Sequence, residues 1–255
     1  MLERLGDDFQ LARLANGWQV GEFPRLRAMT GVSHLVSTRI GLDVQRVRTD
    51  HAHTAGELAR AMDLESVAWV EQVHGNDVFV VEQGGLAGNG DGLLTRTPGV
   101  GLAVRSADCT LILIADPASG VVGAAHASWR GTVKQIAAGL VDKAVAELGM
   151  KAESTIACIC PSAGPCCYEV GQDVVDAAIA GIGPRAREFL LYRRDRVFFD
   201  LWAANVDQLL RKGLRMPNIH MASTCTMCRN DLFPSHRLEK EAAGRFVAAV
   251  GVRQE

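Results

Sequence analysis

The chain has 255 residues, of which 48% are hydrophobic and 22% are charged, the balance of a globular protein with a substantial buried core. Its 27 basic and 29 acidic side chains nearly cancel, so the charge favours neither nucleic acid nor a membrane surface as a partner. No low-complexity tract or flexible linker divides the sequence. We therefore expect a single domain over residues 1–255, in which residues 1–32 are an extension that the sequence defines less well.

The first residues mix charges where a secretory signal would need an apolar core, and no apolar run approaches the length of a membrane span. We expect a cytoplasmic protein, and a monomer. Seven cysteines are an odd number in a reducing compartment, which favours metal binding or thiol chemistry over a disulfide framework.

Short β-rich runs separated by turn residues follow one another in the first half of the chain, at 67–73, 77–82, 101–106, 110–116 and 121–126. After Gly131, hydrophobic residues recur at helical spacing up to Leu148, and Gly149 follows. Thr132 and Gln135 have the spacing of a capping box at the start of this helix. Further helices are predicted over 174–180 and 201–212, with strands over 154–160, 196–200, 218–224 and 245–252. The pattern predicts a mixed α/β (α+β) fold with antiparallel or mixed sheets.

Two histidines and a cysteine fall at the ends of predicted strands: His74 in QVHGNDV, Cys109 in RSADCT and His126 in HASWRGT. Two imidazoles and a thiolate are the ligands of a zinc site that keeps one coordination position open for catalysis. Because the separations are long, residue type and spacing leave an alternative open. In that alternative, Cys109 is a buried small hydrophobic residue and each histidine makes its own hydrogen bond.

The helix predicted after Gly131 would direct free backbone N–H groups toward His126, which favours an anion there. Arg130 adds a charged guanidinium fork suited to phosphate oxygens, although it could equally pair with a surface carboxylate.

Cys225 and Cys228 form a CxxC motif. A closed four-cysteine zinc site would need other cysteines at unfamiliar spacings, either Cys158 and Cys160 or Cys166 and Cys167, so the sequence does not favour one.

The segment CPSAGPCCYEVG at 160–171 is rich in small residues and suits either a loop that passes close to a ligand or a plain connection. His51 and His53 have no clear helix or strand pattern around them, and we expect them to be solvated loop residues.

The motifs above, with CPSAGPCCYEVG and CTMCRNDLFPSHR, occur in an order that resembles the bacterial YfiH-like family, also called peptidoglycan editing factor or laccase-domain proteins. STRIG at 37–41 is similar to the family's N-terminal arginine motif. The resemblance runs from about Ser33 to the C-terminus. It implies a zinc-dependent purine nucleoside phosphorylase acting on adenosine, inosine, guanosine and methylthioadenosine, with adenosine deaminase activity. The metal positions that match are His74, Cys109 and His126.

The resemblance also implies an αββα layered domain with mixed sheets, similar to the cytotoxic-necrotizing-factor-like cysteine-hydrolase fold. For some members it implies a role in peptidoglycan editing, with a weak partner in cell-wall synthesis. The chain departs from the family pattern at Ser128, Cys160 and His236, where glycine, glycine and tyrosine are usual. These departures concern loop geometry and substrate preference and leave the three proposed ligands in place.

For phosphorolysis we expect Arg39 and Arg130 to hold the phosphate. The residue that protonates the leaving base could be Asp77, Asp91 or Asp108, each of which could instead be a turn residue or orient a ligand histidine.

Two rival activities are a copper-dependent polyphenol oxidase and a cysteine hydrolase with Cys109 as nucleophile and His126 as base. The chain's seven histidines are few for a multicopper centre.

Overall fold

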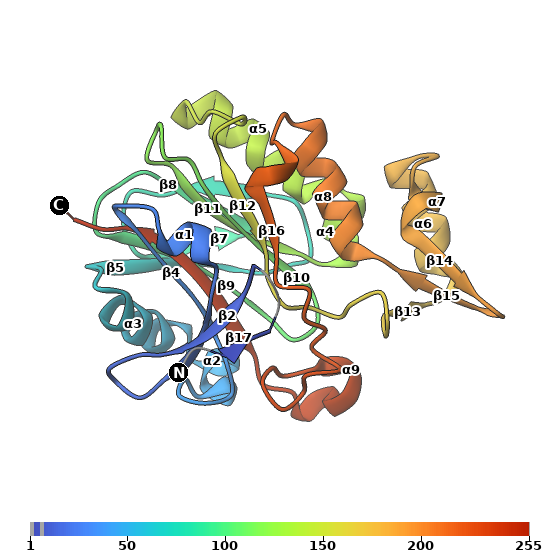
Figure 1. Cartoon of the computed structure of the whole chain (residues 1–255), viewed down its shortest axis with the longest axis horizontal. Coiled ribbons are helices and arrows are strands. Elements are labelled where there is room, and N and C mark those ends of the chain that lie inside the picture. The colour runs from blue at the N-terminus through green and yellow to red at the C-terminus, as the bar shows by residue number, and fades with distance from the viewer. Residues whose placement is uncertain (1–2, 6–7, 255) are drawn as a thin grey trace.

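The computed structural model describes residues 3–5 and 8–254, and its centre is a pair of stacked β-sheets (Figure 1). The larger sheet runs in the order β1 (Glu3–Arg4), β2 (Gln10–Arg13), β3 (Gln19–Glu22), β4 (Val32–Ser37), β17 (Phe246–Val252), β9 (Val100–Ser106), β5 (Ser66–Glu71) and β7 (Gly85–Asn89). The smaller sheet runs in the order β16 (Ile219–Met221), β12 (Ile156–Ile159), β10 (Thr110–Ala115), β11 (Val122–Ala127), β8 (Gly92–Thr95) and β6 (Val78–Val80). Both sheets combine parallel and antiparallel pairs. A third, small sheet contains β13 (Glu169–Val170), β15 (Arg196–Phe199) and β14 (Leu190–Arg193).

The helices are α1 (Pro24–Arg27), α2 (Val44–Thr49), α3 (His51–Met62), α4 (Trp129–Val133), α5 (Ile136–Leu148), α6 (Gln172–Ile182), α7 (Ala186–Phe189), α8 (Leu201–Arg211) and α9 (His236–Glu239). Short 3-10 turns occupy Met216–Asn218 and Lys240–Ala242. Among the described residues, no helix combines the length and the apolar character needed to cross a bilayer.

The two sheets pack face to face, with helices on their outer faces. Figure 1 shows α2 and α3 on one side and α5 and α8 on the other, while α6, α7 and the small sheet project at one end. Leu102 of the larger sheet and Leu111 of the smaller one belong to the apolar core between the sheets. Leu58 of α3 and Leu140 of α5 belong to the outer cores. The expected layering of helix, sheet, sheet and helix is therefore confirmed.

The predicted strands and later helices are present, but the helix predicted from Val133 to Leu148 is interrupted. Gln135 adopts a left-handed backbone conformation, with φ of 64°, between α4 and α5. The expected capping box is wrong, because Ser128 caps α4 instead and its Oγ accepts from the N–H of Gly131 at 3.1 Å. Gln208 of α8 compensates for the break, since its side chain binds the carbonyl of Thr132 and the N–H of Ala138.

The sequence pattern was least informative before residue 66. His51 and His53 lie in the first turn of α3 and not in a loop, so that expectation is wrong. Asp50 caps this helix, because its carboxylate accepts from the N–H of His53 at 3.0 Å. Within the N-terminal segment, β2 and β3 extend the larger sheet by pairing onto β4.

His34 in β4 is buried, and its Nε2 accepts a 2.8 Å hydrogen bond from the backbone N–H of Phe23. Burial, together with the positive charges of Arg253 and Arg27, lowers its pKa from 6.5 to about 3. Between these two values the unfolded chain binds a proton that the folded chain does not bind. The contribution of neutral His34 to stability is therefore complete above about pH 6.5 and is lost as the pH falls toward 3.

We expect His34→Gln to flatten the acid side of the stability profile, because glutamine keeps an acceptor for Phe23 but cannot be protonated. Between about pH 6 and pH 4, the free energy of unfolding from urea titrations should fall less steeply in the variant, by up to about 1.4 kcal/mol per pH unit. His53→Gln, at a half-exposed helix position, is the control and should keep the wild-type slope. Equal slopes for wild type and His34→Gln would contradict the assignment.

Candidate metal centre

The three residues singled out by sequence come together at one end of the stacked sheets. His74 lies in the turn after β5, Cys109 in the turn between β9 and β10, and His126 within β11. One ligand atom from each lies within 4.8 Å of the others, and the imidazole centroids are 5.0 Å apart with the rings edge to face. These atoms could hold one metal ion with a His, Cys, His donor set.

The carboxylate of Asp91 organises this group from behind. It is fully buried and accepts hydrogen bonds from the backbone N–H groups of His74 at 3.1 Å and Gly75 at 2.6 Å. It also binds Nδ1 of His126 at 2.7 Å. Burial raises the pKa of Asp91, but these bonds, led by that of His126, outweigh burial and lower it. Because Nδ1 faces a carboxylate, Nε2 of His126 is the nitrogen left for a metal.

The turn that carries His74 has an unusual backbone conformation and is closely packed. His74 has φ of 59°, in the left-handed region where most residues with a Cβ are strained but histidine, asparagine and aspartate are enriched. Gly131 of α4 packs directly on this turn, and a Cβ there would come within 2.9 Å of the carbonyl oxygen of Gly75. Glycine is thus required at 131 because helix and turn approach so closely.

Cys109 and His126 stabilise each other's charged forms. Burial opposes ionisation of the thiol, yet the charges and hydrogen bonds of His126 and His74 lower its pKa from 9 to about 6. Burial also opposes protonation of His126, but Cys109 and Asp91 raise its pKa to about 9. Near neutral pH the isolated protein therefore favours a thiolate at Cys109, the form in which cysteine binds metals or acts as a nucleophile.

The cluster opens into a cavity of about 520 Å³, within the size range of small-molecule sites. Its wall is rich in arginine and also carries aromatic groups. The lining residues are Arg48, Gln72, His74, Arg105, Ser106, Ala107, Asp108, Cys109, His126, Tyr168, His236, Arg237 and Arg245.

The two arginines expected to hold phosphate do not line this cavity. Arg39 forms an ion pair with Glu239 and donates from Nε to the carbonyl of Asn230 at 2.8 Å. Arg130 is exposed and its guanidinium stacks on the ring of Trp129. The expected helix N-terminus is also less available for an anion, because α4 has only five residues and Ser128 satisfies one of its N–H groups.

Arg48 lies close enough to Arg245 for its charge to disfavour the charged form of Arg245. Burial, then the charge of Arg48, lowers the pKa of Arg245, whereas Cys109 and Asp108 act in the opposite direction. The side chain of Arg245 donates to the carbonyls of Ala243 and Gly244. Cationic groups that repel each other beside a cavity form a setting in which a bound anion is stabilised. Arg48 belongs to α2 and Arg245 immediately precedes β17, so no local motif indicates either one.

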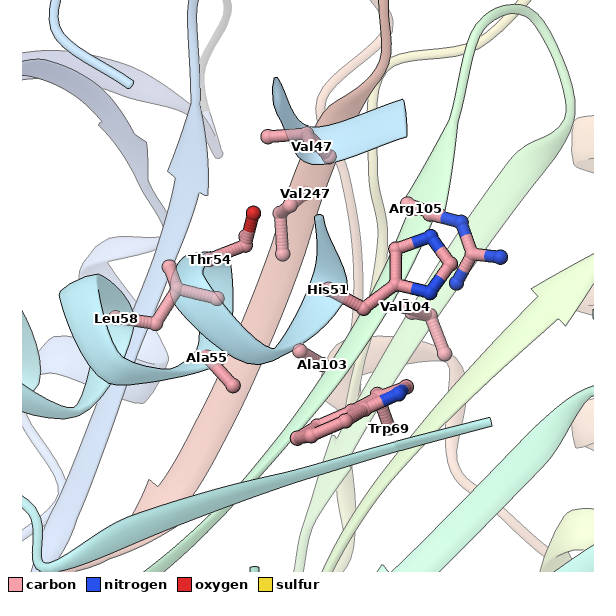
Figure 2. Close-up of a pocket in the computed structure, with 10 residues that line it drawn as sticks. All are labelled: Val47, His51, Thr54, Ala55, Leu58, Trp69, Ala103, Val104, Arg105 and Val247. Carbon is pink, nitrogen blue, oxygen red and sulfur yellow. The ribbon is translucent and has the colours of Figure 1, made fainter. Parts of the chain in front are cut away.

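Arg105 also lines a second, smaller cavity. This cavity lies between α3 and the larger sheet and has room for no more than one water molecule, about 20 Å³. Figure 2 shows His51 beside Arg105 there, with Trp69 below them. Glu71 joins the two, at 3.1 Å from Nδ1 of His51 and 3.3 Å from Arg105. The smaller cavity is too small for a substrate, so the cavity beside Cys109 is the candidate substrate site.

Of the three aspartates weighed for proton transfer, Asp108 alone lines the larger cavity. Its carboxylate accepts from the hydroxyl of Thr226 and from the N–H of Arg237, both at 2.7 Å. Asp91 orients His126, as described above, and Asp77 is exposed.

The remaining cysteine motifs form a second group. Cys166 and Cys167 lie beside Cys225 and Cys228, with all four sulfurs within 4.8 Å of one another. The sequence did not favour this juxtaposition, since it depends on two loops that only the fold brings together.

We expect Asp91→Asn to weaken metal binding, because both carboxylate oxygens accept hydrogen bonds, and an amide N–H₂ in place of either oxygen would face N–H donors, those of His74 and His126 at Oδ1 or that of Gly75 at Oδ2. Removal of such a partner lowers metal affinity by about 10–100-fold. Competition with a chromophoric chelator measures the affinity. The exposed Asp77→Asn is the control, and an unchanged affinity in Asp91→Asn would show that the carboxylate does not orient a ligand.

The chain is similar to known proteins over most of its length. Residues 29–253 match a family model described as multi-copper polyphenol oxidoreductase laccase. Purine nucleoside phosphorylase YlmD of Geobacillus stearothermophilus is 34% identical over 94% of this chain and 96% of its own length. Purine nucleoside phosphorylase YfiH of Escherichia coli is 31% identical over 71% of this chain and 72% of its own.

Solved structures share the fold over nearly the whole chain. The crystal structure of YlmD from Geobacillus stearothermophilus covers 96% of this chain and 99% of its own, with 30% identity and a TM-score of 0.80. That of a Bacillus licheniformis hypothetical protein, YfiH, gives a TM-score of 0.83 at 24% identity over 95% of this chain and 99% of its own. The chain therefore belongs to the laccase-like domain family that includes the YfiH and YlmD proteins.

Proposed function

We propose that this protein is a purine nucleoside phosphorylase whose reactive centre holds zinc between His74, Cys109 and His126. One observation carries the proposal: this donor set, fixed by the buried Asp91, opens into a substrate-sized cavity lined by arginines. A purine nucleoside and inorganic phosphate need an apolar or aromatic wall and an anion site, respectively. Relatives over most of the chain's length carry the name purine nucleoside phosphorylase.

The substrates expected from the family resemblance are adenosine, inosine, guanosine and methylthioadenosine, with deamination of adenosine as a second reaction. Bound zinc supplies a Lewis acid that polarises an oxygen or lowers the pKa of water. Around it, Arg48 and Arg245 bind and orient phosphate by charge-assisted hydrogen bonds. Tyr168, whose pKa is raised chiefly by burial, keeps its proton and offers a hydrogen-bond donor in the cavity wall.

A cysteine hydrolase is the second candidate, because the same atoms fit it. Cys109, His126 and Asp91 have the order of nucleophile, base and orienting carboxylate, and the lowered pKa of Cys109 suits a nucleophile. His74 separates the two functions, since a metal centre needs it as a ligand and the nucleophile mechanism does not.

A copper oxidase is less well supported. Among the described residues, the groups able to hold a metal include two histidines, His74 and His126. Oxygen reduction at a multicopper centre would need more imidazole ligands than these.

We expect His74→Asn to abolish phosphorolysis and to lower bound zinc at the reactive centre. Asparagine tolerates the left-handed backbone of residue 74, so the imidazole is removed with little strain. The rate should fall by at least about 100-fold, because three protein ligands are reduced to two. Chromatography of adenosine incubated with and without phosphate measures free adenine and inosine, and metal analysis of the same sample measures zinc.

The matched control is Val73→Thr, a shape-conserving change at an exposed position beside the same turn. Full activity in His74→Asn together with loss of activity in Cys109→Ser would favour the cysteine nucleophile instead. Wild-type protein that releases no base from any of the four nucleosides with phosphate present would overturn the proposal.

We expect Arg245→Gln to raise the KM for phosphate by about 10–100-fold, the loss of one hydrogen bond to a charged group. The KM for the nucleoside should change much less, because the nucleoside carries no charge. Initial rates over a phosphate series measure both constants. Arg130→Gln and Arg39→Gln are informative comparisons, and a larger phosphate effect in either of them than in Arg245→Gln would move the anion site to the sequence-predicted residues.

A further inference from the structure

Four cysteines on two separate loops meet away from the reactive centre. Cys166 and Cys167 belong to the loop after β12, and Cys225 and Cys228 to the loop after β16. Their sulfurs all lie within 4.8 Å of one another. The sulfur of Cys228 is 3.7 Å from that of Cys166 and 3.5 Å from that of Cys167.

These spacings are those of four ligands around one ion. Tetrahedral coordination with zinc–sulfur bonds of about 2.3 Å separates the sulfurs by about 3.8 Å. A disulfide would bring two of them to about 2.0 Å and leave the others without a partner. A cluster in which each sulfur is near the other three is therefore arranged for a shared cation.

The backbone around Cys225 supports a thiolate. Its sulfur accepts a hydrogen bond from the N–H of Gly164 at 3.3 Å. A Cβ at residue 164 would come within 3.2 Å of the Cβ of Cys225, so glycine permits this approach. Metal-bound sulfurs commonly receive such N–H donors.

We propose that Cys166, Cys167, Cys225 and Cys228 form a second metal site in this protein, a closed tetrathiolate site for zinc. Four thiolates and no open position are the donor set of a structural zinc, and tetrahedral sulfur ligands select zinc or iron. The cation offsets the charge of four adjacent thiolates. This site is independent of the reactive centre and of the activity proposed for it.

The site joins the two loops that form one wall of the substrate-sized cavity. Tyr168 follows Cys167 directly, and Arg237 lies in α9, the helix that follows the second loop. Arg237 stacks on the Tyr168 ring and donates to the carbonyl of Glu169 at 2.9 Å. On the second loop, Thr226 bonds Asp108 beside the reactive cysteine. A metal between the loops would fix the relative positions of these cavity groups.

The test uses the Cys109→Ser variant of the full chain, because its reactive centre then contains no sulfur. Protein purified under reducing conditions should contain zinc, and its X-ray absorption spectrum should show about four sulfurs at about 2.3 Å. Further replacement of Cys225 and Cys228 by serine should remove this sulfur signal. Zinc without sulfur neighbours in Cys109→Ser, or no metal at all, would overturn the proposal.

A second arm needs no reactive-centre substitution. Wild-type protein should hold about two zinc ions, and Cys225→Ser/Cys228→Ser about one. The matched control is Cys158→Ala/Cys160→Ala, which replaces two buried cysteines outside the cluster and should keep both. If the reactive centre holds no zinc, the wild-type protein should instead contain about one zinc ion and Cys225→Ser/Cys228→Ser none. A disulfide between cluster cysteines, found by mass spectrometry in protein purified reduced and with zinc, would also overturn the proposal.

Discussion

The hydrogen bonds of the Asp91 carboxylate are the constraint on which the candidate metal centre depends. Asp91 immediately precedes β8, yet its oxygens bind the turn after β5 and the imidazole of His126 in β11. One buried negative charge thus fixes two of the three donors, which come from different sheets. Burying a carboxylate is unfavourable unless its lone pairs are satisfied, and here N–H groups from several elements satisfy them. The geometry of the site therefore depends on how the two sheets stack, because the groups that Asp91 binds are carried by both sheets.

The sequence singled out the three clustered side chains, His74, Cys109 and His126, better than their surroundings. His74, Cys109 and His126 lie in compact motifs at strand ends, where a turn exposes a side chain, and local pattern is enough to find them. Arg48 and Arg245 carry no such signal, because they reach the cavity from a helix and a strand end nearly 200 residues apart. Arg130 lies within HASWRGT and was favoured because its charged fork adjoins the predicted helix start beside His126, but it lies outside the cavity lining.

The same distinction explains the other differences. Helix α3 was not predicted, because its apolar face includes small alanines and its start contains two histidines, so the pattern was weak although Asp50 caps it. The break at Gln135 depends on Gln208 of a distant helix, which binds the interrupted backbone. The meeting of Cys166 with Cys228 depends on two loops that follow neighbouring parallel strands, β12 and β16. The break at Gln135 and the cysteine cluster are set by tertiary contacts, and local sequence does not encode them.

The left-handed backbone at residue 74 restricts how this protein can change over evolution. Cysteine and glutamate are ordinary zinc ligands, but at this position either would add about 1–2 kcal/mol of backbone strain. Glycine, which would relieve the strain, contributes no ligand. Histidine is among the few residues that satisfy both the backbone and a metal. Aspartate is the other residue that both tolerates this backbone and binds zinc, so a lineage that loses the histidine can regain a donor at this turn through aspartate, whereas cysteine or glutamate would strain the backbone.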